Sequence, residues 1–166
     1  MNLVTALALV IGALGALATY LFLGPLAAMG IPLSIWAAFI AWGSFYNNGG
    51  GEGGLKTAII GAIWGAICAT LALILIPIIG MGTVGVAIAV GLTVALMILG
   101  AHVPLLSAIP ASVYGYASTA AFALMKTGAA ATGTDIATSP FLNIVASMIV
   151  GALFGYVSEK IAKAIA

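Results

Sequence analysis

The chain has 166 residues, of which 64% are hydrophobic and only 4% are charged, and its formal net charge is +1. A soluble domain usually contains about 45–50% apolar residues, so this composition excludes a water-facing surface for most of the chain. The small net charge and the lack of a basic stretch also exclude an electrostatic surface for nucleic acid. We therefore expect an all-α polytopic membrane protein that has the lipid bilayer as its solvent.

Six membrane spans fit this length, because one spanning helix needs about 20 apolar residues. The spans are expected at Leu3–Leu23, Ala27–Tyr46, Leu55–Ile76, Gly82–Gly100, Ile109–Met125 and Phe141–Val157. The sequence places Gly24-Pro25, Pro77, Gly80, Pro104 and Pro140 between spans, where a missing amide or a flexible backbone does least harm. The glycine-rich segment up to Gly54 is predicted to be a flexible turn. A single transmembrane domain then covers residues 1–166.

The lysines indicate the orientation of these spans. Lys56, Lys160 and Lys163 lie on the side of the two termini, and Lys126 lies on the opposite side. Because cytoplasmic loops carry an excess of basic residues, we expect both termini in the cytoplasm.

An internal repeat relates the two halves of the chain. Ile31–Trp36 (IPLSIW) matches Ile109–Tyr114 (IPASVY) 78 residues later, and Ile60–Gly65 (IGAIWG) matches Val150–Gly155 (VGALFG) 90 residues later. The alternative is a chance recurrence of small and aromatic residues in apolar helices. The order and spacing favour two repeats, 1–77 and 78–166, with three spans each. Because three is odd, the second repeat would enter the membrane from the opposite side, as in the inverted repeats of many channels and transporters.

The same residues resemble a known family. Ser34–Phe39, then Phe45 and the glycine run into Lys56, are similar to the first half of the YcdZ-like family. The helix that begins at Ile109-Pro110 and the segment Gly151–Tyr156 are similar to its second half. These are small bacterial inner-membrane proteins with a domain of unknown function. The resemblance implies a six-span protein of the bacterial inner membrane, and it implies no activity.

Small residues recur every fourth position in the third and sixth spans, including Gly61 and Gly65 in one and Gly151 and Gly155 in the other. Such a stripe lets two helix backbones approach closely in lipid. We expect these two spans to cross tightly, and a subunit interface is the alternative. A homo-oligomer also fits the small size of the chain, because a 16.4 kDa bundle has little room to enclose a wide path.

The second and fifth spans mix aromatic rings with hydroxyl groups. Polar groups that face hydrocarbon are costly, so these faces are expected to point at protein or at a water-filled cavity. The residues expected to line a pathway are Ser34, Trp36, Phe39, Ser112, Tyr114, Tyr116 and Thr119. In the fifth span, Ser112, Tyr116 and Thr119 share one face, and Tyr114, Ala117, Ser118 and Ala121 share a neighbouring one. The alternative is that the rings fill the core and the hydroxyls bond their own helix backbone.

Three other polar or helix-breaking features have two interpretations each. Pro32 and Pro110 are interpreted as first-turn prolines, although each could instead break its helix and free backbone carbonyls. His102 is interpreted as a solvated loop histidine rather than a gate. Asn143 is expected to face either the cavity or a neighbouring helix.

The function that these features predict is a passive channel for small neutral polar solutes of the urea, ammonia or water class. One alternative is an ion-coupled secondary transporter of a small solute, and another is a non-transporting membrane component that stabilises a partner. Enzymatic activity is not expected, because the chain has no plausible set of catalytic residues and no metal-ligand spacing. No cofactor and no metal are expected either.

Overall fold

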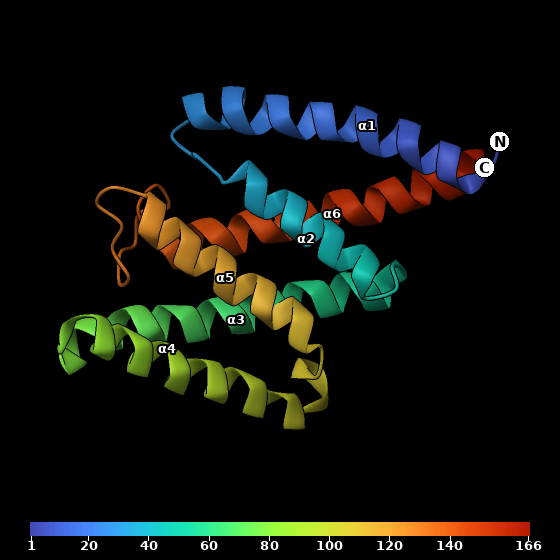
Figure 1. The fold of residues 1–166 in the computed structure, drawn as a ribbon. Helices are drawn as coiled ribbons and strands as arrows, with labels where there is room; N and C mark the ends of the chain where they lie inside the picture. The colour runs from blue at the N-terminus through green and yellow to red at the C-terminus, as the bar shows by residue number, and fades with distance from the viewer.

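The computed structural model describes residues 1–166, which fold into helices without any strand. The six α-helices are α1 (Leu3–Leu21), α2 (Ile35–Asn47), α3 (Gly51–Ile79), α4 (Gly82–Leu99), α5 (Ile109–Met125) and α6 (Pro140–Ile165). Short helical turns at Phe22–Leu26, Gly100–His102 and Pro104–Leu106 complete the structure. Successive helices run back and forth between the same two ends of the molecule, with α2 and α5 crossing obliquely in front of α6 and α3 (Figure 1). The two chain termini meet at one end, where the Met1 amino group donates to the carbonyl of Ala166.

Four helical segments are long and apolar enough to cross a membrane. They are Leu3–Leu26, Gly51–Ile79, Gly82–His102 and Pro140–Ile165. The other two helices are shorter, since α2 has 13 residues and α5 has 17. The expected second span, Ala27–Tyr46, is therefore wrong at its start, because α2 begins only at Ile35.

Two prolines lie inside helices rather than between spans, and both predictions are corrected. Pro25 lies in the π-helical extension of α1, Phe22–Leu26. A π-turn alters the hydrogen-bond pattern of the backbone, so it accommodates a residue that has no amide proton. Pro77 lies within α3, which continues to Ile79 and ends at Gly80, where φ is +66°.

The glycine run is also more ordered than predicted. The turn after α2 closes at Gly50, and α3 begins at Gly51 instead of Leu55. A distant carboxylate explains the early start, because the amide of Gly51 donates to Glu159 Oε2 at 2.7 Å. An anion at a helix N-terminus satisfies a free amide and complements the helix dipole. The expected flexible turn through Gly54 is therefore wrong, since Gly54 belongs to α3.

The glycine stripes contact different helices from those expected. A Cβ atom added to Gly65 would overlap the carbonyl oxygen of Ser112 in α5, and one added to Gly151 would lie 2.5 Å from the carbonyl carbon of Ala38 in α2. Gly61 similarly faces α5, and Gly155 faces α2. The close approaches are therefore α3 with α5 and α6 with α2. The α3 and α6 helices also touch each other, but the glycines are not used for that contact.

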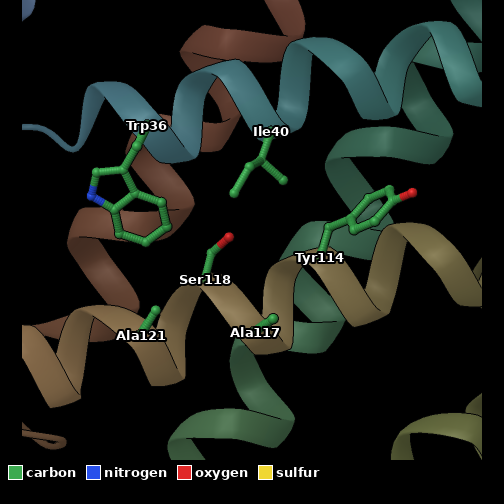
Figure 2. A pocket seen from close by; sticks show the side chains of 6 residues that line it. All are labelled: Trp36, Ile40, Tyr114, Ala117, Ser118 and Ala121. Atoms are coloured by element: carbon green, nitrogen blue, oxygen red, sulfur yellow. The ribbon is translucent and has the colours of Figure 1, made fainter.

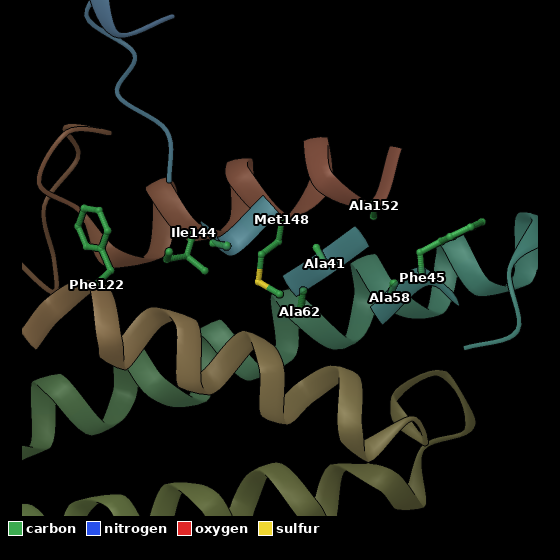
Figure 3. Close-up of a cluster of buried hydrophobic side chains, with 9 residues drawn as sticks. Ala41, Phe45, Ala58, Ala62, Phe122, Ile144, Met148 and Ala152 are labelled. Carbon is green, nitrogen blue, oxygen red and sulfur yellow. The ribbon is translucent and has the colours of Figure 1, made fainter. Parts of the chain in front are cut away.

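The main hydrophobic core lies between α2, α3, α5 and α6, as Figure 3 shows. Its buried members are Ala37, Ala41, Phe45, Ala58, Ala62, Phe122, Ile144, Met148 and Ala152. The α1 helix packs mainly on α6, and α4 packs mainly on α3. Both α2 and α5 therefore pack on this core, and the packing determines how the two helices face each other.

Candidate functional site

The backbone at Ile31–Ser34, immediately before α2, is not helical, and buried side chains of α6 form hydrogen bonds with its free polar groups. Asn143 Nδ2 donates to the carbonyl of Pro32 at 2.8 Å, and the amide of Ser34 donates to Ser147 Oγ at 2.9 Å. Ser34 Oγ donates to Asn143 Oδ1 at 2.7 Å. Asn143 and Ser147 are fully buried. Backbone polar groups at membrane depth need such partners, since lipid offers none.

Pro32 and Pro110, which had the same two interpretations, differ in the structure. Pro32 precedes its helix and frees a carbonyl, so its interpretation as a first-turn proline is wrong. Pro110 occupies the first turn of α5, as the sequence predicted. Asn143 contacts the non-helical segment before α2 instead of a cavity.

A cavity of about 190 Å³ lies between α2 and α5. Its lining residues are Trp36, Ile40, Tyr114, Ala117, Ser118 and Ala121. Figure 2 shows the Trp36 indole and the Tyr114 ring at its two ends, with the small α5 side chains between them. The volume is several times the roughly 30 Å³ that one water molecule occupies. We call this space the α2/α5 cavity.

One residue in the wall of this cavity has a buried hydroxyl group without a partner. Ser118 is 1% exposed, and its Oγ atom makes no hydrogen bond within the protein. In Figure 2 this oxygen points from α5 into the space between Trp36 and Ile40. A buried hydroxyl without a partner costs about 1–3 kcal/mol, so a group in the cavity that bonded it would recover stability.

A second cavity, of about 180 Å³, adjoins the first. It is lined by Ser34, Trp36, Phe122, Met125 and Lys126. Trp36 is common to both linings. The indole therefore stands in the wall of each cavity, and we call the second one the Lys126 cavity.

The structure brings three of the seven sequence-predicted pathway residues to these cavities, namely Trp36, Tyr114 and Ser34. Phe39 is 44% exposed and stacks on Trp42 at 5.8 Å between ring centroids. Tyr116 points toward α4, where its hydroxyl lies 2.9 Å from that of Thr93.

The remaining two predicted residues are buried on other sides of α5. Thr119 Oγ donates to the carbonyl of Gly115 in its own helix at 2.9 Å. Ser112 is buried against α3 near Gly65, and its hydroxyl has no partner.

Ser118 is not among the residues predicted from the sequence to line a pathway, although it is the only residue of the α2/α5 cavity besides Trp36 and Tyr114 that has a polar side-chain atom. The available signal was its helical spacing, since Tyr114, Ala117, Ser118 and Ala121 share one face. That face lines the cavity, and the face with Ser112 lies on α3. No group of three or more His, Cys, Asp or Glu side chains lies together in the structure.

Apolar helices long enough to span a bilayer, with polar groups bonded in the interior, define a helical membrane protein. The chain belongs to the family described as "Protein of unknown function (DUF1097)", which it matches over residues 8–163. No curated protein and no solved structure matches the chain. The resemblance to YcdZ-like proteins in particular stays a prediction.

Proposed function

We propose that all six α-helices cross the bacterial inner membrane as two inverted three-helix repeats, with both termini in the cytoplasm. The contact pattern supports this arrangement, because exchanging the two halves converts each major contact into another one. The α2 helix packs on α6 and α5 packs on α3, while α1 packs on α6 and α4 packs on α3. The α2/α5 cavity is lined by two repeat-equivalent pairs, Trp36 with Tyr114 and Ile40 with Ser118, each 78 residues apart.

We propose that the protein is a passive channel for small neutral polar solutes and that the α2/α5 cavity is part of the path. The observation that carries the proposal is the α2/α5 cavity itself, which no charged side chain lines and which holds the rings of Trp36 and Tyr114 at its two ends, with the unpartnered hydroxyl of Ser118 buried in its wall. A hydroxyl both donates and accepts, so it suits a neutral amide, an amine or water. The rings of Trp36 and Tyr114 offer flat faces to such a solute.

The same cavity is unfavourable for ions. No charged side chain lines it, and bringing an ion into an apolar space without compensating groups is very costly. Trp36 lines both the α2/α5 cavity and the Lys126 cavity, so a solute that moved from one to the other would have to pass this residue. In the proposed mechanism Trp36 is therefore the gate, and the Lys126 cavity is the outer vestibule.

The test is stopped-flow volume recovery of liposomes that contain the purified protein, after osmotic shocks with urea, formamide, glycerol and buffer alone. The wild-type protein should accelerate recovery for at least one solute relative to empty liposomes. Ser118→Ala should reduce that rate, because a solute in the cavity loses one hydroxyl partner. Ser112→Ala removes an unpartnered hydroxyl of the same helix from a different face, so it tests which face of α5 lines the path.

A fall in flux with Ser112→Ala alone would assign the path to the other face of α5. Rates equal to those of empty liposomes, with insertion verified, would refute the channel. The two alternatives then make different predictions. An ion-coupled transporter shows uptake only with an ion gradient, and a partner-stabilising component is recovered in a stoichiometric complex after mild solubilisation.

A further inference from the structure

A continuous groove follows the outward face of α3. Three cavities lie along it in succession, and neighbouring cavities share one residue each, Ile60 and then Ile67. The α3 residues that line the three cavities are Gly53, Lys56, Thr57, Ile60, Ile63, Trp64, Ile67, Thr70, Leu71 and Ile74. They recur every three or four positions, so they form one stripe of the helix surface. We call this feature the α3 groove.

The two ends of the groove differ in polarity. The first cavity, of about 210 Å³, is lined by Lys56, Thr57 and Ser107 among others. The middle cavity is lined only by Ile60, Ile63, Trp64, Ile67 and Leu106. The last cavity, of about 380 Å³, is closed on one side by Phe141 of α6 and is almost entirely apolar. The groove thus combines a polar end with a long apolar trough.

The polar end carries a positive charge that is not part of an ion pair. Lys56 forms no ion pair, since the structure contains a single one, between Lys163 and Glu159. Glu52, one turn earlier in α3, does not line the groove. The Thr57 hydroxyl donates no hydrogen bond within the protein, whereas Ser107 Oγ donates to the carbonyl of Pro104 at 2.8 Å. Lys56 and Thr57 are therefore free to bind an anion.

The part of the groove between Lys56 and Ile67 matches one leaflet of a bilayer, and the rest of the groove continues beyond Ile67 to Ile74. Lys56 and Ile67 are eleven residues apart in α3, which corresponds to about 16 Å along the helix axis. Half of a hydrocarbon core of about 30 Å is about 15 Å. A lipid with its phosphate at Lys56 would thus place its chain ends near Ile67, at the middle of the bilayer.

We propose that the α3 groove is a specific binding site for one anionic phospholipid. Its phosphate contacts Lys56 Nζ and Thr57 Oγ, and one acyl chain lies along Ile60, Ile63 and Ile67. Charge complementarity selects the anionic headgroup, and the apolar trough selects an acyl chain over a free phosphate or a soluble anion. The site is independent of the proposed channel, because the α2/α5 cavity and the groove have no lining residue in common.

The test uses delipidated protein in detergent, with phosphatidylglycerol or phosphatidylcholine of the same acyl chains added in increasing amounts. Native mass spectrometry counts the bound lipids. The wild-type protein should bind one phosphatidylglycerol, about fivefold more tightly than phosphatidylcholine, since one lysine near a phosphate contributes about that much. Lys56→Gln should abolish this preference. The matched control is Lys160→Gln, which removes the same charge from α6, where Lys160 lies over the Tyr156 ring and outside the groove.

A second pair of variants tests the trough without changing charge. Ile67 is 44% exposed, so Ile67→Trp should fold normally while it narrows the groove, and it should weaken binding of both lipids. Leu92→Trp, at an exposed position of α4, is the control and should have no effect. The proposal is overturned if Lys160→Gln lowers the preference as much as Lys56→Gln does. It is equally overturned if Ile67→Trp binds lipid like the wild type, or if no single-lipid adduct forms.

Discussion

The contact between α3 and α5 allows a sharp test of the packing at Gly65. In Gly65→Ala the new Cβ would overlap the carbonyl oxygen of Ser112 and lie 2.6 Å from the amide nitrogen of Tyr116. Ordinary contact begins near 3.4 Å, so the Tyr116 contact alone requires α5 to move by about 0.8 Å, and the overlap with the Ser112 oxygen requires a larger movement. Backbone atoms cannot rotate away, and overpacking of this kind costs about 1–3 kcal/mol. The better helix propensity of alanine returns up to about 1 kcal/mol, which leaves a net loss of about 2 kcal/mol for a clash at the upper end.

The matched control is Gly12→Ala in α1, where an added Cβ meets nothing within 4 Å. For a chain of this size, 1 kcal/mol corresponds to about 2–4 °C in the midpoint of thermal unfolding, Tm. Gly65→Ala should thus lower Tm by about 4–8 °C in detergent, and Gly12→Ala should leave it unchanged or raise it by a few degrees. Equal Tm shifts for both variants would refute the inferred close approach of α3 and α5.

Two further predictions concern polar contacts that link the halves. Asn143→Leu removes the donor to the Pro32 carbonyl within the buried network, so it should lower the free energy of unfolding by about 2–4 kcal/mol, measured by thermal unfolding in detergent. A Tm within 2 °C of the wild type would contradict this. Glu159→Gln loses an ion pair with an exposed lysine but keeps an acceptor for the amide of Gly51, so it should cost less than about 1 kcal/mol. Glu159→Leu leaves that amide without a partner and should cost about 1–3 kcal/mol more, and equal losses for the two variants would show that the Gly51 contact is unimportant.

Much of the helix framework follows from hydrophobicity and length alone. The fourth span, expected at Gly82–Gly100, is observed as α4 at Gly82–Leu99. Glycines that are visible in the local sequence, Gly82 and Gly100, lie at its two ends. The starts of α2 and α3 did not follow from local signals, because each depends on a residue of α6, more than 100 positions away. Ser147 bonds the amide of Ser34, and Glu159 bonds the amide of Gly51.

The candidate site was predictable in part, from the sequence match between the two halves of the chain. The match of Trp36 with Tyr114 pointed to the two residues that stand at the ends of the α2/α5 cavity. Helical spacing gave two neighbouring faces of α5, but it could not say which of them turns toward α2. That choice depends on the glycines of α3, which press against α5 at Ser112 and so direct Ser118 to the cavity. The orientation of α5 therefore could not be predicted from the α5 sequence alone, because it depends on contacts with another helix.

The dependence of the first helices on α6 has a consequence for how the protein is made. The α1 and α2 helices pack mainly on α6, and the non-helical backbone before α2 forms hydrogen bonds with Asn143 and Ser147. A ribosome synthesises α6 after the other five helices, so the first half of the chain is made without its main packing partner. The final fold of the first half therefore cannot form before α6 has been made, because α2 and the non-helical backbone before it lack these contacts until then.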